Sequence, residues 1–208
     1  MLNEVKRGPT FQDWGIRAIL NTKLDTWPPE PIDASKPYKW QTRRLTKLQP
    51  PPGTPAANIW LESHRCFCPY PPGVYYVREA LQRCDCRVLE DDAMYAEGRD
   101  VVNIGDTEED SGLLFWDWQR NILPACFMPR AAARLFIRIR KVRVERVQDI
   151  TCKEVAAEGL PTCDLLATPE ERFAAVWDEI HGKGAWARND WVFVYEFERV
   201  SQELSQLI

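Results

Sequence analysis

An alternation of leucine or isoleucine with other side chains, two of them arginine, marks the third quarter of the chain. From 135 to 140, leucine or isoleucine occupies every second position, and the positions between carry Phe136, Arg138 and Arg140. A period of two is typical of a β-strand with one buried face. We therefore expect a long, basic strand that begins near Arg134 and ends before the helix described next.

The segment after this strand predicts a short helix. Thr151, followed three residues later by Glu154, matches a capping box, in which two side chains satisfy free backbone amides at a helix start. Gly159 is typical of the position just past a helix end. We expect a helix from about Cys152 to Glu158, so that Glu158 lies in its last turn.

Four further elements follow from periodicity. Apolar spacing predicts helices over 11–20 and over 168–182, and alternation predicts strands over 74–78 and 191–198. The second of these helices has threonine at its cap and proline at its first position, which are favoured there. Strands interleaved with short helices predict an α+β domain built on a small, partly closed, mixed β-barrel flanked by short helices.

The chain is expected to form a single domain over 1–208, because its length suits one hydrophobic core. Prolines in 28–31 and 50–55 prevent a helix there, since proline lacks an amide donor. The acid-rich stretch 97–112 has neither a helical nor a strand period. The expected insertions are proline-rich and acidic loops near 21–37, 48–58 and 90–112.

Charge and composition narrow the classes of function. The formal charge of −4 argues against a uniformly basic coat for nucleic acid, although bases gather in 36–47 and 130–146 and predict a local anion-binding face. No apolar stretch is long enough to cross a bilayer, and the N-terminus lacks the order of a signal peptide. We expect a cytoplasmic protein with no membrane partner. Seven cysteines, an odd number, in that setting predict no structural disulfide.

Candidate chemistry lies in the basic segment from Lys39 to Arg44, which reads Lys-Trp-Gln-Thr-Arg-Arg. By itself, such a segment is typical of a solvated surface turn. Its functional interpretation is that a lysine crowded by cations and partly desolvated has its ammonium form disfavoured. Lys39 would then act as a base towards a nearby hydroxyl, and Thr42 supplies one.

The same segment belongs to a set of motifs that runs in order through most of the chain. These are Lys39 to Arg44, Pro72 to Glu79, Met128-Pro129-Arg130, Val144 to Ile150 leading into Ala156 to Gly159, and Trp191 to Phe197. Together they resemble the ASCH family, and in particular its phage and prophage branch. The resemblance implies a PUA-like β-barrel fold, which is associated with RNA binding. Small bacterial members that are similar to this chain are amidohydrolases that remove the acyl group from N(4)-acetylcytidine.

The resemblance also implies a catalytic set. The family's lysine falls on Lys39, its threonine on Thr42 and its helical glutamate on Glu158, while Trp40 stands where a threonine is common. In that interpretation Lys39 takes a proton from Thr42, or from a water that Thr42 holds, and a protonated Glu158 gives a proton to the leaving amine. No cofactor is needed. The alternative for Glu158 is an exposed helical glutamate.

Residues that bind substrate or nucleic acid are expected in the same motifs and in the basic stretches. Trp40 is the best candidate for stacking on a base, because aromatic faces stack on unpaired bases. Arginines hold phosphate through paired donors. The candidates are Trp40, Arg43, Arg44, Arg78, Glu79, Arg130 and Arg138.

A metal site is a further alternative. Cys66 with Cys68 and Cys84 with Cys86 form two C-x-C pairs, and four thiolates would hold zinc tetrahedrally. The spacing differs from the usual two-residue gap, and the other interpretation is four free thiols, some of them buried. The hydrolytic hypothesis itself uses no metal.

Three functions remain open from the sequence. The first is an amidohydrolase that acts on an acylated cytosine nucleoside. The second is a non-catalytic module that binds RNA or single-stranded DNA, with phosphate contacts from Arg43, Arg44, Arg138 and Arg140. The third is a phage morphogenesis or host-interaction factor that uses the acidic loop and proline tracts. The acidic total favours the enzyme, because a small nucleoside needs no extended basic face.

Overall fold

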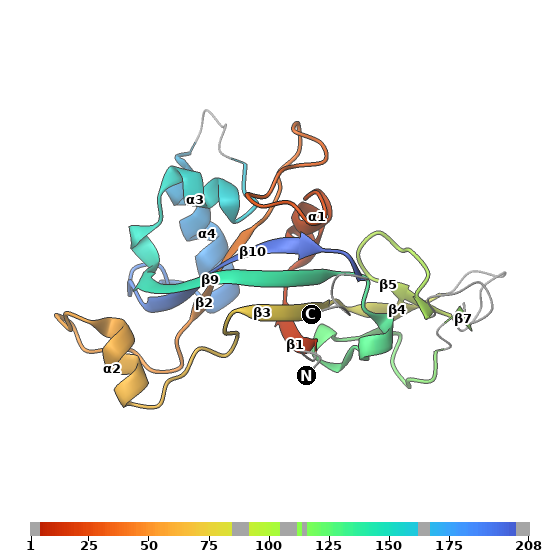
Figure 1. Ribbon diagram of the computed structural model, residues 1–208, viewed down its shortest axis with the longest axis horizontal. Coiled ribbons are helices and arrows are strands. Elements are labelled where there is room, and N and C mark those ends of the chain that lie inside the picture. Colours follow the sequence, from red (N-terminus) through yellow and green to blue (C-terminus); the bar gives the residue numbers. More distant parts are fainter. Residues whose placement is uncertain (1–4, 85–91, 105–111, 114–115, 162–166, 203–208) are drawn as a thin grey trace. The chain divides into compact units, whose positions relative to one another are not determined.

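The computed structural model describes residues 5–84, 92–104, 112–113, 116–161 and 167–202. The chain is mixed α+β, rich in strands and with few helices (Figure 1). Contacts divide it into two compact units, each built from separate segments. Unit 1 comprises Met1–Arg17, Val74–Ile137 and Val200–Ile208, and unit 2 comprises Ala18–Gly73 and Arg138–Arg199.

Unit 2 is organised around strands that come from distant parts of the sequence. Strand β2 (Gln41–Leu45) pairs antiparallel with β10 (Trp191–Val200), with Arg43 opposite Val194 and Thr42 opposite Tyr195. Strand β9 (Phe136–Arg146) is the other neighbour of β10 (Figure 1). The strands expected over the basic stretch and over 191–198 are therefore confirmed.

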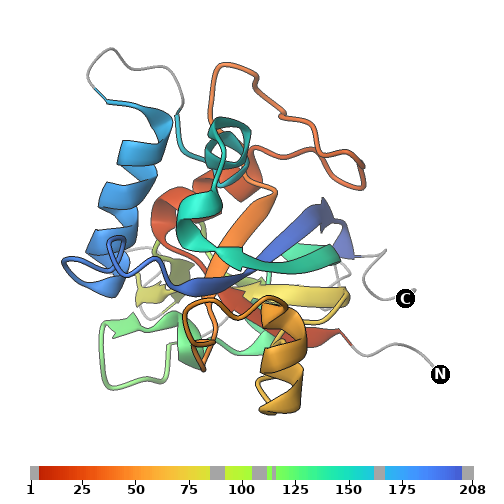
Figure 2. The same ribbon diagram turned by 90° about the vertical axis from the view of Figure 1, so that its left-hand side faces the viewer.

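Two helices of unit 2 begin where their sequence caps predict. Helix α3 (Cys152–Ala157) starts with the Thr151–Glu154 capping box, and α4 (Pro169–His181) starts at Thr168 with proline at its first turn. Both lie on one side of β2 and β10 (Figures 1 and 2). A short 3-10 turn, η3 (Val147–Asp149), connects β9 to α3. Both predicted helices are confirmed.

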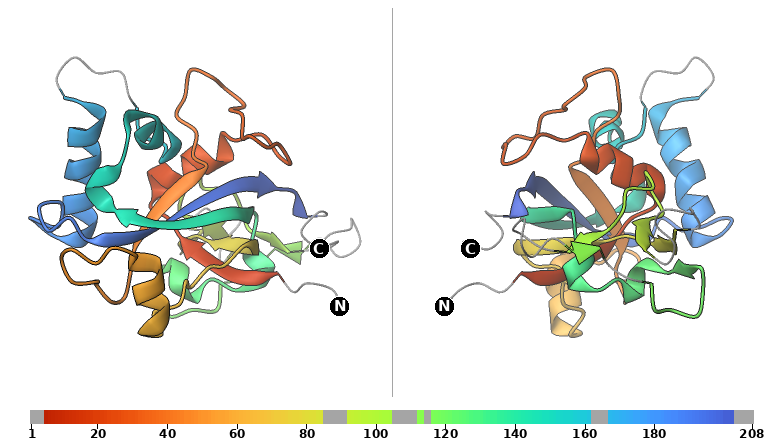
Figure 3. Two further views of the ribbon diagram at one scale, coloured as in Figure 1. Left: turned by 60° about the vertical axis from the view of Figure 1, so that its left-hand side comes forward. Right: turned by 90° about the vertical axis from the view of Figure 1, so that its right-hand side faces the viewer.

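A single apolar cluster fixes these helices on the strands of unit 2. Its buried members come from η3, α3, α4, β10 and the connecting residues Ile150 and Ala185, and three half-buried side chains pack against it. They are Val147, Ile150, Val155, Phe173, Trp177, Ala185, Val192 and Val194, with Leu45, Leu160 and Trp186 around them. Helix α2 (Ala57–Ser63) stands apart from α3 and α4 in the same unit (Figure 3). The packed face thus carries β2 and α3 together.

Unit 1 contains shorter pairings. Strand β1 (Lys6–Thr10) runs parallel to β3 (Gly73–Arg78), and β4 (Leu81–Arg83) lies between β5 (Ala93–Tyr95) and β8 (Ile122–Leu123). Two 3-10 turns follow, η1 (Ala125–Phe127) and η2 (Arg130–Ala132). Helix α1 (Asp13–Leu20) begins in this unit and ends in unit 2, and it confirms the helix expected over 11–20.

One expectation for the acidic stretch is wrong. Short strands β6 (Asn103–Ile104) and β7 (Gly112–Leu113) pair antiparallel, and Met94 forms a bridge with Val101. Two-residue strands carry too few positions for a period to be visible, so the sequence pattern shows only polarity. Residues 105–111 lie outside the described residues.

The described strands of each unit form open sheets, and no closed barrel is seen among them. What the structure establishes is therefore the coarser architecture, a small α+β fold. Within the described ranges, no helix has both the length and the apolar character needed to cross a membrane.

Candidate active site around Lys39 and Glu158

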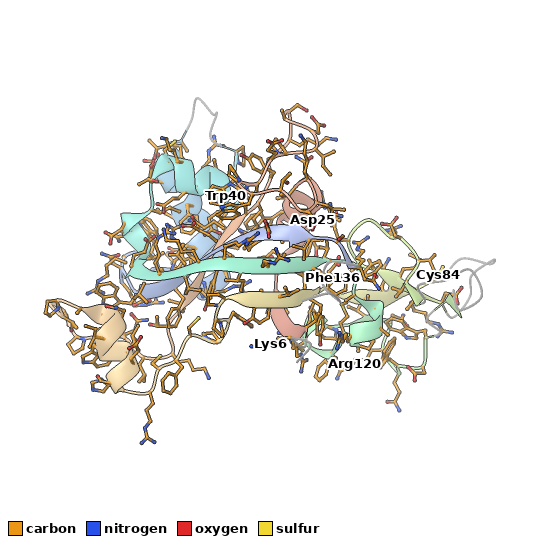
Figure 4. All side chains as sticks on the ribbon, viewed as in Figure 1. Lys6, Asp25, Trp40, Cys84, Arg120 and Phe136 are labelled. Carbon is orange, nitrogen blue, oxygen red and sulfur yellow. The ribbon has the colours of Figure 1, made fainter. Side chains whose placement is uncertain are left out.

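Lys39 lies in unit 2 just before β2, and backbone bonds on both sides fix it there. Its amide donates to Ala18 O at 3.0 Å, and the next amide, that of Trp40, donates to Ala157 O at the end of α3, also at 3.0 Å. Figure 4 labels Trp40 at this junction. The Lys39 residue is only 2% exposed. A lysine that the sequence could place on a surface turn is instead an interior residue.

Glu158 is the C-terminal cap of α3 and is 3% exposed. The chain turns away immediately after it, because Gly159 has a φ of +85°. A β-carbon at Gly159 would lie 2.9 Å from Ala18 Cβ and 3.1 Å from Lys39 Cβ, closer than side chains normally approach. Glycine therefore serves two needs here, the left-handed backbone and the tight contact with Lys39.

The two side chains meet although they are 119 positions apart. Lys39 Nζ donates to Glu158 Oε2 at 2.7 Å and to the Glu158 carbonyl oxygen at 2.6 Å. The side chains are 2% and 5% exposed, so the pair is shielded from water. Burial lowers the pKa of Lys39 because the ammonium loses its hydration; Glu158 opposes this shift, and Arg44 and Arg43 add to it.

Arg43 occupies the other oxygen of Glu158. Its Nη1 lies 3.3 Å from Glu158 Oε1, while its Nη2 lies 2.5 Å from Glu145 Oε1 and 3.3 Å from Glu154 Oε2. The Arg43 side chain has 0% exposure. Three carboxylates thus surround one buried guanidinium, which differs from the expectation that Arg43 contacts phosphate at a surface.

Arg143 ties the acids of this cluster to one another. It donates from Nε to Glu145 Oε2 at 2.9 Å, and its terminal nitrogens contact the carboxylates of Glu154 and Glu196. Gln41 Oε1 lies 3.5 Å from Arg143 Nη2, at the limit of a hydrogen bond. The network extends from α3 through β2 to β9 and β10, so ion pairs between these elements hold Lys39 and Glu158 in position.

Sequence reasoning missed the acidic half of this network. Glu154 and Glu158 are four residues apart, a spacing that puts two side chains on one face of a helix. Arg143 and Glu145 are two apart on β9, a spacing that puts them on one face of a strand. These two spacings were the available signals. Neither reveals that the two faces meet.

Thr42 is also buried, with 6% exposure, but on a different face. Successive side chains of a strand point to opposite faces, so Thr42 and Arg43 diverge. Arg43 shares Glu158 with Lys39, whereas Thr42 lies opposite Tyr195, whose hydroxyl accepts from Cys68 Sγ at 3.6 Å. The structure brings Lys39 and Glu158 together and puts Thr42 on the other face of β2.

The remaining candidates in unit 2 are Trp40, Arg44 and Arg138. Trp40 and Arg44 are half-buried. Arg138 Nη1 donates to Glu198 Oε1 at 3.1 Å, and Arg140 Nη2 approaches the same oxygen at 2.6 Å. Since Glu198 is 1% exposed, it anchors both arginines and neutralises one of their two charges.

Three candidates lie in unit 1. Arg130 is exposed, and Arg78 is half-buried with its Nε donating to Gly8 O at 3.0 Å. Glu79 is 2% exposed and accepts from Arg134 Nη2 at 2.8 Å. Arg134 also contacts Asp100 and lies with its guanidinium carbon 3.8 Å from the Tyr95 ring centre. Glu79 is thus part of an interior ion pair that belongs to unit 1.

The cysteines are spread over both units. Cys66 is buried and Cys68 is half-buried in unit 2, whereas Cys84 is buried in unit 1. Figure 4 labels Cys84 near the end of β4. Cys86 lies outside the described residues. Among the residues that are described, no group of three or more His, Cys, Asp or Glu side chains is arranged to hold a metal ion.

Comparison with known proteins gives no match to a family model, to a curated protein or to a solved structure. The family resemblance accordingly rests on the motifs of the sequence. The site rests on the buried contacts of Lys39, Arg43 and Glu158.

Proposed function

We propose that this chain is an amidohydrolase that removes acyl groups from N(4)-acylated cytosine or cytidine. The observation that carries the proposal is the Lys39–Glu158 contact, 2.7 Å between Nζ and Oε2, in which both side chains are buried. A lysine whose pKa is lowered by burial can act as a base, and a carboxyl next to it can deliver the proton onward. A PUA-like barrel, as implied by the motifs, is part of the same proposal.

The chemistry requires one proton to pass from Lys39 to Glu158 during the reaction. With Lys39 as the neutral amine and Glu158 as the carboxylate, Lys39 removes a proton from an attacking water, because Thr42 lies on the other face of β2. Glu158 takes this proton from Lys39 and passes it to the amide nitrogen, so that the carbon–nitrogen bond breaks and the cytosine amine leaves. One amide and one water thus give a carboxylic acid and a free amine, and Lys39 and Glu158 return to their starting protonation states.

The burial of the pair favours a small substrate over a polymer. Lys39 and Glu158 are 2% and 3% exposed, so any substrate that reaches them must enter the fold of unit 2. A single nucleoside needs a smaller opening for this than a folded RNA does. This agrees with the acidic total charge, which disfavours an extended basic face.

The decisive experiment is hydrolysis of N(4)-acetylcytidine by the purified protein, followed by liquid chromatography. The wild type should form cytidine, and Lys39→Ala should lose it by orders of magnitude because the base is gone. Lys23→Ala is the matched control: Lys23 lies in the same unit, but its side chain is 50% exposed and paired with Glu30. A panel of acylated cytosines left intact by wild type, or a fully active Lys39→Ala, would reject the proposal.

The role of Thr42 needs a separate pair of variants. Thr42→Ser keeps the hydroxyl and Thr42→Val keeps only the shape, and both should retain most turnover because Thr42 lies on the other face of β2 from Lys39 and Glu158. Mass spectrometry of quenched reactions then distinguishes the two mechanisms, because only a nucleophilic Thr42 carries the acyl group. If Thr42→Val is as active as wild type, the reaction runs on Lys39 and Glu158 without a hydroxyl at this position.

A binding function is the second candidate, because unit 2 keeps one aromatic and cationic surface. Arg140 lies with its guanidinium carbon 5.9 Å from the ring centre of Trp27, whose exposure is 45%. Exposed aromatics beside arginine can hold unpaired bases. A filter-binding titration with RNA and single-stranded DNA should show steeply salt-dependent affinity if this surface binds a polymer. An absence of binding at low salt would remove it.

A further inference from the structure

The carboxylate of Glu158 is shared between two buried cations, and each takes a different oxygen. Oε2 is 2.7 Å from Lys39 Nζ, and Oε1 is 3.3 Å from Arg43 Nη1. The side chains of Lys39 and Arg43 are 2% and 0% exposed. With so little water present, the charge of Glu158 is divided between the two. The hold of Glu158 on the proton of Lys39 therefore depends on Arg43.

Arg43 is fixed on its far side, which keeps it at Glu158. Its Nη2 is 2.5 Å from Glu145 Oε1 and 3.3 Å from Glu154 Oε2, and its guanidinium carbon lies 5.8 Å from the Phe173 ring centre. Arg143 in turn holds both of those glutamates. A guanidinium gripped at several points cannot turn away when a substrate enters, so its effect on Glu158 is built in.

We propose that Arg43 is a positioning residue for the reaction: by engaging Oε1 of Glu158, it holds that carboxylate in place and weakens its grip on the proton of Lys39. The inference rests on the proposed function, because it explains how a lysine that touches a carboxylate can still serve as a base. Arg43 itself contacts neither the substrate nor the reacting atoms in this role. Its influence passes through Glu158 and through its own charge.

The charged groups around Lys39 all enter this balance. Glu158 faces it from the end of α3 and raises its pKa, while Arg44 and Arg43 face it from β2 and lower it. Glu154 from α3 and Glu145 from β9 act through Arg43, and Glu196 from β10 acts through Arg143. Arginine does not lose its proton in proteins, so its contribution is the same at every accessible pH.

The test measures the titration of Lys39 itself and needs no substrate. Protein labelled with 13C at the lysine ε-carbon is titrated by NMR, and the Lys39 signal is assigned from its absence in Lys39→Met. Arg43→Met removes one cation and frees Glu158 to hold the ammonium, so the Lys39 midpoint should rise by about one pH unit or more. The acid-side limb of the kcat/KM profile of an active enzyme, where Lys39 becomes protonated and inactive as a base, should shift to higher pH with it.

Two further variants keep the test decisive. Arg134→Met, which takes a guanidinium from the buried Glu79 of unit 1, should cost stability and leave the Lys39 midpoint unchanged. Glu145→Gln removes one of the carboxylates that share the charge of Arg43, so Arg43 should act more strongly on Glu158 and the Lys39 midpoint should fall. This variant decides the matter if Arg43→Met does not fold. An unchanged or lowered midpoint in folded Arg43→Met, or a raised one in Glu145→Gln, would overturn the inference. A wild type without hydrolytic activity would reject the proposed function, but the Lys39 midpoint would still report on Arg43.

Discussion

Each unit of the chain buries a glutamate against an arginine, and the two pairs differ in where they lead. In unit 1, Glu79 is bonded to Arg134, whose side chain is 18% exposed and reaches Asp100, itself 72% exposed. In unit 2, Glu158 is bonded to Arg43 and to Lys39, at 0% and 2% exposure. The pair in unit 1 contacts a further residue that is exposed to solvent, whereas the pair in unit 2 contacts a buried amine.

This difference separates a structural ion pair from a candidate for chemistry. Burial raises the pKa of Glu79, and Arg134 opposes the shift. Arginine does not lose its proton in proteins, so this pair exchanges no proton between its partners. Lys39 is different, because a lysine shifts its pKa readily when it is buried and can become a neutral amine. A buried carboxylate is therefore not informative by itself. The identity of its cation is.

The largest expected effect comes from removing each glutamate in turn. Glu158→Ala leaves two buried cations without their shared carboxylate and should cost about 3–5 kcal/mol of unfolding free energy. Glu79→Ala should cost about 1–3 kcal/mol, because Arg134 keeps Asp100 and its contact with Tyr95. Urea unfolding of both variants checks the order. Equal losses would mean that the two clusters are equivalent.

A second prediction concerns pH. The pKa of Lys39 is lowered in the folded state, so its contribution to stability is fully present above its unfolded value, about 10.4, and is lost as pH falls through the folded pKa. The stability of the wild type relative to Lys39→Met should therefore rise with pH between the folded and the unfolded pKa of Lys39, by about 1.4 kcal/mol for each step of one in pH. Unfolding curves between neutral and alkaline pH measure it. A constant difference would show that folding leaves the pKa of Lys39 unchanged.

The smallest effect is expected at an exposed pair. Lys23 and Glu30 are 2.7 Å apart with side chains 50% and 58% exposed, so water and salt screen their attraction. Lys23→Ala should leave the unfolding midpoint unchanged within measurement error. A clear loss of stability there would show that the loop around residues 21–37 contributes more than its exposure indicates.

Among the described elements, local signals made three of the four α-helices and the three longest strands predictable. The caps at Thr151 and Thr168 act within four residues, so the sequence alone is enough to locate the starts of α3 and α4. The same is true of β10, where aromatic residues occupy every second position from Trp191 to Phe197. The pairing of β6 with β7 had no such signal, because two-residue strands have no period.

The site was predictable only in part. A basic motif includes Lys39 and Arg43, and a helix end includes Glu158, but neither shows that both faces of β2 are buried or which face meets Glu158. That depends on the register with β10, where Arg43 lies opposite Val194 of the apolar cluster. The partners Glu145 and Glu154 then come from more than 100 positions away in the sequence. Arg43, which the sequence suggests for phosphate binding, is consequently paired with carboxylates in the interior.

The close approach of Gly159 has a consequence for how the chain tolerates substitution. Its position leaves no space for a β-carbon, with Lys39 Cβ at 3.1 Å and Ala18 Cβ at 2.9 Å. Any larger residue there pushes the chain before β2 away from α3 and separates Nζ of Lys39 from Glu158. In a saturation library sorted by activity, a position with no side chain should be depleted as severely as the lysine beside it. A larger residue at position 18 should also push the chain before β2 away from α3. A smaller residue at position 159 cannot relieve this crowding, since glycine is already the smallest residue.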